Sequence, residues 1–165
     1  MLLMFYGRVV ESRSANPIIT DPKAEIIATQ ISPLLLKSDS STLRRLGQLK
    51  ISKTLAVHAA IRARQYDAYT LEFMKENPNC TVVNLGCGLD TRFWRIDNGK
   101  IHFYDLDLPE VISFRKRFLE ENARYKMLGC SVFDRSWIET VIDHKQPVML
   151  LAEGLFMYLP HQELK

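Results

Sequence analysis

Two glycines separated by one residue, Gly86 and Gly88, follow directly after a short apolar run. Glycine lets a backbone turn tightly and lets a ligand approach the main chain, so such a pair could hold a bound molecule. Asp107 stands about 20 positions further on, near the spacing at which a carboxylate reaches the two hydroxyls of a ribose. The glycine pair and this acid together favour a ligand that contains a nucleoside.

Polar residues also follow two further apolar runs. Ser131 and Asp134 come after one of them, and Glu153 comes directly after the other. Each residue alone has a simpler explanation: the glycines could form an ordinary turn, Asp107 could cap a helix or stabilise a turn, and Asp134 favours a helix cap over a ligand contact. Glu153 is harder to explain in this way, because it lies at the end of a buried strand. A group that could bind a nucleoside follows each of four consecutive predicted strands. Such a coincidence is much less expected by chance than one such group alone.

Two missing motifs narrow the choice of nucleoside ligand. Thr91 occupies the third glycine position of the G-x-G-x-x-G fingerprint of dinucleotide sites, which disfavours NAD. The sequence also lacks the G-x-x-x-x-G-K-[ST] loop that holds ATP. S-adenosylmethionine, which carries ribose and adenine without phosphate, therefore fits best. An NAD-dependent oxidoreductase stays open as an alternative.

Four short apolar segments, alternating with helical patterns, must position these groups. Continuous apolar strands that alternate with helices predict a parallel sheet covered on both faces, which is the α/β class. In such sheets ligands bind beyond the carboxyl ends of the strands. One helix is expected from Pro109, with Val111, Phe114 and Phe118 on one face, and another after Asp134, bearing Trp137, Ile138, Val141 and Ile142. The expected strands are Cys80–Leu85, Lys100–Leu106, Tyr125–Cys130 and Pro147–Ala152.

The first half of the chain has a helical pattern. A helix is expected from Asp21 and Pro22, with Pro33 ending or kinking it, and a second over Thr54–Glu76. The Ser-rich segment 38–45 is expected to be a loop. Pro160 resembles the start of a last helix that the chain does not complete, so the sequence is interpreted as a truncated domain. Its last strand would then lie near an exposed sheet edge, through which a homo-oligomer could form.

Composition excludes several other classes of function. The 165 residues fit one domain, and the net charge of +3 is too small to favour a nucleic-acid partner. Three irregularly spaced cysteines, with no C-x-x-C pair, indicate free thiols in a reducing compartment and no structural zinc site. No stretch of the sequence is as long as the apolar core of a signal peptide or of a membrane span. The sequence therefore predicts a cytoplasmic protein that needs no metal or membrane.

Three blocks of the sequence carry a resemblance to a known family. The segments "VVNLGCGLDTRFWRI", "FYDLDLPEVISFRK" and "LLAEGLFMYLP" resemble the leucine carboxyl methyltransferase family, and above all its bacterial O-methyltransferase-like members. The opening "YGRVVESRSANPIITDPKAEII" and "IRARQYD" are similar as well. The resemblance implies the class I methyltransferase fold, a Rossmann-like, mostly parallel sheet. Residues 1–78 would form an N-terminal helical lid, and residues 79–165 the cofactor-binding half of an incomplete domain that lacks its C-terminal strands.

The resemblance also implies roles for individual residues in binding S-adenosylmethionine. Arg62 matches the arginine that holds the methionine carboxylate, with Arg64 as the alternative. The backbone of Gly86, with Gly88 beside it, would meet the cofactor, Asp107 would bind the ribose, and Glu153 would face the positive sulfonium and ammonium groups. Family members often place Asp-Leu beside the adenine, where this chain has Ser131 and Val132. Ser131 would be a weaker partner, and the nearby Asp134 could compensate.

The implied reaction is methyl transfer to an oxygen of a small molecule or peptide. A carboxylate acceptor is already nucleophilic at neutral pH, whereas a hydroxyl needs a general base, and no residue stands out as one. The sequence names neither the acceptor nor a catalytic residue. A fragment that binds cofactor without catalysis, alone or paired with another chain, remains the alternative.

Overall fold

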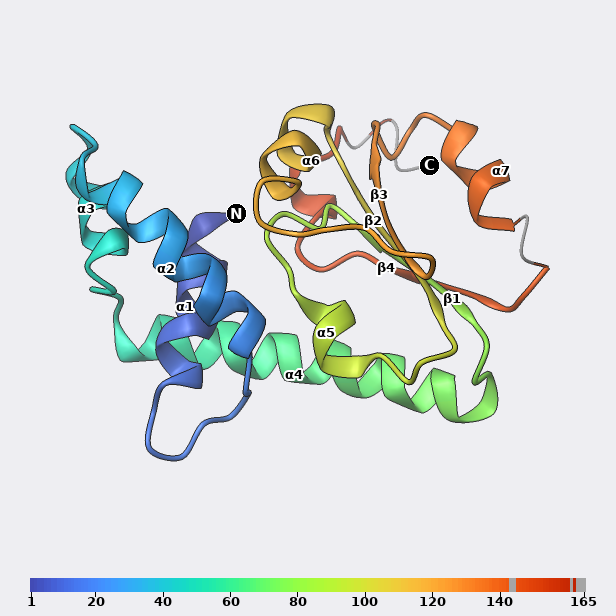
Figure 1. Cartoon of the computed structure of the whole chain (residues 1–165), viewed down its shortest axis with the longest axis horizontal. Helices are drawn as coiled ribbons and strands as arrows, with labels where there is room; N and C mark the ends of the chain where they lie inside the picture. Colours follow the sequence, from blue (N-terminus) through green and yellow to red (C-terminus); the bar gives the residue numbers. More distant parts are fainter. Residues whose placement is uncertain (143–144, 161, 163–165) are drawn as a thin grey trace. The chain divides into compact units, whose positions relative to one another are not determined.

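The four segments predicted as strands pair into one parallel sheet. In the computed structural model, which describes residues 1–142, 145–160 and 162, the strands lie in the order β3-β2-β1-β4 (Figure 1). The prediction of a parallel α/β sheet is therefore confirmed, and each strand boundary lies within two residues of the expected one. The strands are β1 (Thr81–Leu85), β2 (His102–Asp107), β3 (Tyr125–Gly129) and β4 (Val148–Leu151).

The pairing brings the carboxyl ends of the strands to one edge of the sheet. Leu85 of β1 pairs with Leu106 of β2, and Asp107 pairs with Gly129 of β3. On its other side, β1 pairs in parallel with β4, with Asn84 opposite Leu151. The strand order thus reverses beside β1, and such a reversal is where open α/β sheets bind ligands.

Helices cover both faces of this sheet. Helix α7 (Ser136–Ile142) places Trp137 and Val141 in a buried cluster with three residues of β1 and β2: Val83, Tyr104 and Leu106. Side chains alternate along β2, so Phe103 and Asp105 point to the opposite face. There Asp105 meets Arg115, the last residue of α6 (Pro109–Arg115). The fold is therefore Rossmann-like.

The N-terminal half is helical, as its pattern predicts. Asp21 caps α2, because its carboxylate accepts a hydrogen bond from the Ala24 backbone N–H at 3.1 Å. This confirms the predicted helix start. The helices are α1 (Leu2–Ser12), α2 (Pro22–Leu36), α3 (Ser41–Gly47), α4 (Lys53–Glu76) and, after β1, the short α5 (Arg92–Ile96).

The chain forms two compact units, which are described separately here. The first contains residues 1–68 together with the segment Leu89–Ile96, and the second contains residues 69–88 and 97–165. The boundary between them falls inside α4. No helix among the described residues combines the length and the apolar character needed to cross a bilayer.

Three details of the predicted elements are wrong. Helix α2 does not end at Pro33 but continues to Leu36. Pro33 and Thr29, whose carbonyl loses its partner, both lie on the exposed side, where water can replace the missing bond. Segment 38–45 is not all loop, since Ser40 caps α3. Helix α6 ends at Arg115, so Phe118 lies beyond it, and the buried residues of the helix are Ile112 and Arg115. The helix expected after Pro160 falls mostly outside the described residues.

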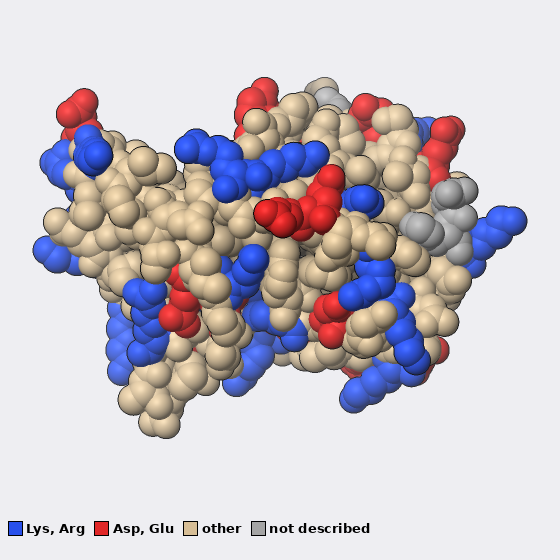
Figure 2. Space-filling view, in the orientation of Figure 1, with Lys and Arg blue, Asp and Glu red and all other residues tan. Residues whose placement is uncertain are grey.

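Charged side chains are interspersed on the surface. On the face shown in Figure 2, lysines and arginines lie among aspartates and glutamates and do not form one extended basic area. Strand β4 pairs only with β1 among the described residues, so it lies at the sheet edge, as expected. Its Leu150 is 54% exposed. Association through this edge stays a prediction.

We expect Gly7→Ala to destabilise the first unit, because α1 and α4 approach closely at this position. A Cβ added to Gly7 would lie 2.9 Å from the Ala59 Cβ, which is too close for van der Waals contact. The overlap should lower the free energy of unfolding by about 1–3 kcal/mol, although alanine has the better helix propensity. Urea unfolding measures the change.

The control for this substitution is Leu3→Ala in the same helix, at a side chain that is 43% exposed. It should change the stability by no more than about 0.5 kcal/mol. A Gly7→Ala protein as stable as the unmodified chain would show that the two helices are not in close contact there.

Candidate functional site

The glycine turn, residues 86–88, begins where β1 ends. Both Gly86 and Gly88 have left-handed backbone conformations, with φ of +65° and +50°. The turn stays attached to the neighbouring strand, because the N–H groups of Gly86 and Cys87 donate to the Leu106 carbonyl at 2.8 and 3.2 Å. The predicted turn is therefore present, at the carboxyl edge of the sheet.

Gly86 cannot be replaced without strain. Besides its positive φ, a Cβ built on it would lie 2.9 Å from Leu155 Cδ1. Leu155 belongs to the segment after β4 that also contains Glu153. The structure thus brings the glycine motif and the "EGL" motif, which lie far apart in sequence, into direct contact.

Asp107 ends β2 and is held by two backbone donors. Its Oδ2 accepts a hydrogen bond from the Gly88 N–H at 2.8 Å, and its Oδ1 accepts one from the Leu108 N–H at 2.8 Å. A carboxylate oxygen can accept about two hydrogen bonds, so each oxygen keeps capacity for one more donor. The side chain is half-buried. Such an oriented carboxylate could accept hydrogen bonds from two adjacent hydroxyls.

A second, fully buried acid lies behind the turn. Asp105 accepts hydrogen bonds from Asn84 Nδ2 at 2.8 Å and from the Tyr125 hydroxyl at 2.6 Å, and it pairs with Arg115. Arg115 Nη2 also donates to the Tyr125 hydroxyl at 2.9 Å, and its Nη1 donates to the Gly88 carbonyl at 2.7 Å. The buried group Asn84, Asp105, Arg115 and Tyr125 thereby connects the core of the sheet to the glycine turn.

Charge interactions keep Arg115 ionised. Burial alone would lower the pKa of Arg115, but Asp105, Cys87 and Tyr125 together outweigh burial and hold that pKa above its usual value. Burial raises the pKa of the Tyr125 phenol, and the charge of Asp105 raises it further. Arg115 is therefore a permanent cation and Tyr125 a neutral donor at any physiological pH.

The remaining predicted residues of this unit lie at the same edge. Ser131 follows β3; its Oγ accepts from the Phe133 N–H at 3.3 Å and its carbonyl accepts from the Asp134 N–H. Asp134 accepts from the Ser136 N–H at 3.0 Å at the start of α7, and this bond lowers the pKa of its carboxyl. Asp134 thus binds the first backbone N–H of α7 from the residue before the cap position, and its contact with a ligand stays a prediction. Glu153 follows β4 and is half-buried.

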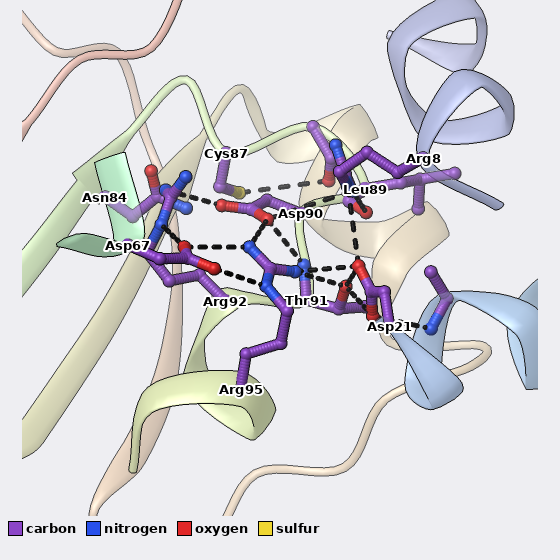
Figure 3. A network of polar contacts seen from close by, with 12 residues as sticks. Arg8, Asp21, Asp67, Asn84, Cys87, Leu89, Asp90, Thr91, Arg92 and Arg95 are labelled. Carbon is purple, nitrogen blue, oxygen red and sulfur yellow. Dashed lines mark hydrogen bonds and ion pairs between the residues drawn. The ribbon is translucent and has the colours of Figure 1, made fainter. Parts of the chain in front are cut away.

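In the first unit, the segment Leu89–Ile96 is tied to the N-terminal helices by a network of buried charges (Figure 3). Thr91 is fully buried, and its hydroxyl lies 2.7 and 2.6 Å from the two oxygens of Asp21. Arg95 Nη1 donates to Asp21 at 2.7 Å, and Arg95 Nε donates to Asp67 of α4 at 2.7 Å. Thr91 therefore has a structural role at the position where a dinucleotide fingerprint has glycine.

The charges of this network are balanced. Arg92 Nε pairs with Asp67 at 2.7 Å, and its Nη1 pairs with Asp90 at 2.6 Å. Burial would lower the pKa of Arg95, but the surrounding carboxylates outweigh it and raise that pKa. Arg8 of α1 completes the network with a 3.1 Å hydrogen bond to the Leu89 carbonyl. Three arginines thus face three aspartates, Asp21, Asp67 and Asp90, away from water.

A family model for leucine carboxyl methyltransferases matches residues 1–165 of this chain. The chain belongs to the leucine carboxyl methyltransferase family. This confirms the family resemblance stated above, and the Rossmann-like sheet is consistent with the methyltransferase fold that the family implies.

Individual relatives agree with this assignment. The chain is 31% identical over 160 residues to the tetracenomycin polyketide synthesis O-methyltransferase TcmP of Streptomyces glaucescens, covering 96% of this chain and 55% of that protein. It is 26% identical to the S-adenosyl-L-methionine-dependent methyltransferase dpfgK of Gibberella zeae, covering 99% and 56%. A putative S-adenosyl-L-methionine-dependent methyltransferase of Mycobacteroides abscessus is 29% identical, covering 93% and 54%. The chain spans about half the length of these curated relatives.

The predicted cofactor-binding residues are divided between the two units of the structure. Gly88 donates to Asp107, and Gly86 donates to the adjacent Leu106 carbonyl, all within the second unit. Ser131 and Asp134 follow β3 and Glu153 follows β4, which are the two outer strands of the described sheet. Arg62 lies on α4 in the first unit and is half-exposed, so its part in the site stays a prediction.

Sequence reasoning missed the contribution of Arg115. The signal that could have found it is the spacing of Ile112 and Arg115, which places the arginine three residues after an apolar position on the same face of α6.

We expect Thr91→Val to destabilise the network, because valine has the same shape but cannot donate to Asp21. Loss of a buried hydrogen bond to a charged group should lower the free energy of unfolding by about 1–3 kcal/mol. The matched control is Thr29→Val, whose hydroxyl donates to the Ile26 carbonyl on an exposed stretch of helix. Urea unfolding of both variants makes the comparison, and equal effects would contradict a special role for Thr91.

Proposed function

We propose that this chain binds S-adenosylmethionine at the carboxyl edge of its sheet and is part of an enzyme that transfers the methyl group to an oxygen acceptor. The observation that carries the proposal is the geometry of Asp107. Its carboxylate is oriented by one backbone N–H on each oxygen, beside a glycine turn whose residues 86 and 88 have left-handed backbone conformations. The printed functions of the relatives, all methyltransferases, support the same proposal.

The residues at this edge fit the chemical groups of the cofactor. The remaining acceptor capacity of Asp107 suits the two ribose hydroxyls. The negative charge of Glu153 suits a sulfonium or an ammonium group. Arg62 belongs to the first unit, and its guanidinium suits the methionine carboxylate by its chemistry. Ser131 and Asp134 are the candidates for contact with the adenine. A dinucleotide pyrophosphate fits less well, because Thr91 is occupied by its bonds to Asp21.

The chain would contribute to catalysis by orientation. When bound, S-adenosylmethionine supplies an electrophilic methyl group attached to a sulfonium. Asp107 and the glycine turn would hold the adenosine part, and Glu153 would set the local charge, so that an acceptor oxygen could approach in line. None of the predicted site residues that follow the four strands is a histidine. We propose a carboxylate acceptor, which needs no general base, ahead of a hydroxyl.

Isothermal titration of the chain with S-adenosylmethionine tests binding. We expect Asp107→Asn to weaken the affinity about tenfold, because the amide loses one acceptor oxygen and about one hydrogen bond to the ribose. Asp97→Asn is the matched control, because Asp97 is an acid of the same unit that lies before β2 begins. It bonds to the Gly99 N–H and to Arg124, which directly precedes β3, so its contacts are at the opposite ends of the strands from Asp107. A folded chain that shows no heat with the cofactor would overturn the proposal, and tighter binding of NAD would favour the oxidoreductase.

Transfer of a labelled methyl group to a panel of carboxylic acids and phenols tests catalysis separately. Labelling of an acid is the expected result. Cofactor binding without labelling of any acceptor, in a chain of the full length of the relatives, would instead support a binding protein without this activity.

A further inference from the structure

Arg115 is one of the largest completely buried side chains of the protein. A buried cation is costly unless its charge is paired and its donors are satisfied. Asp105 provides the opposite charge through Nη2, and this pair leaves Nη1 in need of another acceptor. Arg115 extends Nη1 to the Gly88 carbonyl at 2.7 Å, while Nη2 serves Asp105 and Tyr125.

The result is that both polar groups of Gly88 are held by side chains. Its carbonyl accepts from Arg115, and its N–H donates to Asp107 Oδ2 at 2.8 Å. Asp105 and Asp107 lie two positions apart on β2 and so extend to the same face of the sheet. Gly88 therefore connects the buried pair Asp105–Arg115 to the one carboxylate that we assign to the ribose.

This connection gives Arg115 a role beyond core stability. The left-handed conformation of Gly88, with φ of +50°, is one of several that glycine adopts readily. Without a partner on its carbonyl, the residue could rotate, and its N–H would leave Asp107. The carboxylate would then keep only the bond from Leu108 on Oδ1 and lose its fixed orientation.

We infer that Arg115 is a positioning residue for the cofactor site, which holds Gly88 so that Asp107 presents both oxygens to the ribose hydroxyls. The inference rests on the proposed binding of S-adenosylmethionine. It assigns to Arg115 an effect on one particular contact, the ribose, rather than on stability in general.

The test compares the binding of S-adenosylhomocysteine with that of its 2′-deoxyribose analogue. In the unmodified chain the missing hydroxyl should weaken binding about tenfold, the value of one hydrogen bond. Arg115→Lys keeps the positive charge but not the two Nη groups of the guanidinium. We expect this variant to bind S-adenosylhomocysteine about tenfold more weakly than the unmodified chain does. The ratio between the two ligands should then fall below about threefold, because Asp107 no longer distinguishes them.

Tyr125→Phe is the matched control. It removes the hydroxyl that bonds to Asp105 and Arg115 but leaves the bond from Arg115 to Gly88 in place. It should lower the unfolding midpoint and keep the tenfold ratio. If Arg115 contributed only to stability, the unfolding midpoint would fall in both Arg115→Lys and Tyr125→Phe. The ratio of the affinities for the two ligands would then stay at about tenfold in both variants.

A second variant covers the case in which lysine does not fold in the buried site. Asp105→Asn combined with Arg115→Met removes both charges and again leaves the Gly88 carbonyl without its donor. An unchanged ratio in either folded variant overturns the inference, as does failure of both variants to fold, which would make Arg115 a stability residue only. Failure of the unmodified chain to bind either ligand would instead overturn the proposed function.

Discussion

The hydrogen bonds that fix Gly88 are the interaction on which the candidate site depends. A glycine turn is by itself the least ordered type of backbone, since glycine has the widest choice of conformations. Here the N–H is bound by Asp107 and the carbonyl by Arg115, both from segments that follow in the sequence. The turn can therefore consist of glycines and still be well defined in position.

The cost of this arrangement is a buried ion pair inside the sheet. Asp105 and Arg115 are both removed from water, and Asn84 and Tyr125 supply the hydrogen bonds that make their burial tolerable. Replacement of such a pair by apolar residues is often neutral for stability, so its presence indicates a requirement other than stability. Orientation of the glycine turn is a requirement that apolar residues could not meet, because they offer no donor to a carbonyl.

The same principle operates in the first unit. Three arginines and three aspartates are buried together, and Asp21 combines a helix cap with bonds to Thr91 and Arg95. Charged groups that satisfy one another accept few alternative partners, so the network specifies how α1, α2 and α4 surround the segment Leu89–Ile96. Thr91 is the clearest example, since a glycine there would leave Asp21 without its hydroxyl donor.

Much of the fold could be predicted from the sequence, because it depends on patterns that are local. Runs of six or seven mostly apolar residues identified all four strands to within two residues, and Asp21 followed by Pro22 identified a helix start. The family was also recognisable, since its motifs are contiguous stretches. The errors arose where surroundings outweighed local preference: Pro33 is tolerated on an exposed helix face, and a Ser-rich stretch becomes a helix once Ser40 caps it.

The sequence by itself determined which residues stand at the ends of the strands, because strand and turn patterns are written within a few neighbouring positions. Gly86, Gly88, Asp107 and Glu153 could all be placed there without coordinates. Only the tertiary structure decided what those residues touch. Three contacts join positions that are 27 to 70 residues apart: Leu155 with Gly86, Thr91 with Asp21, and Arg115 with the Gly88 carbonyl. No local pattern encodes such contacts, since they depend on strand register and on which helix face becomes buried.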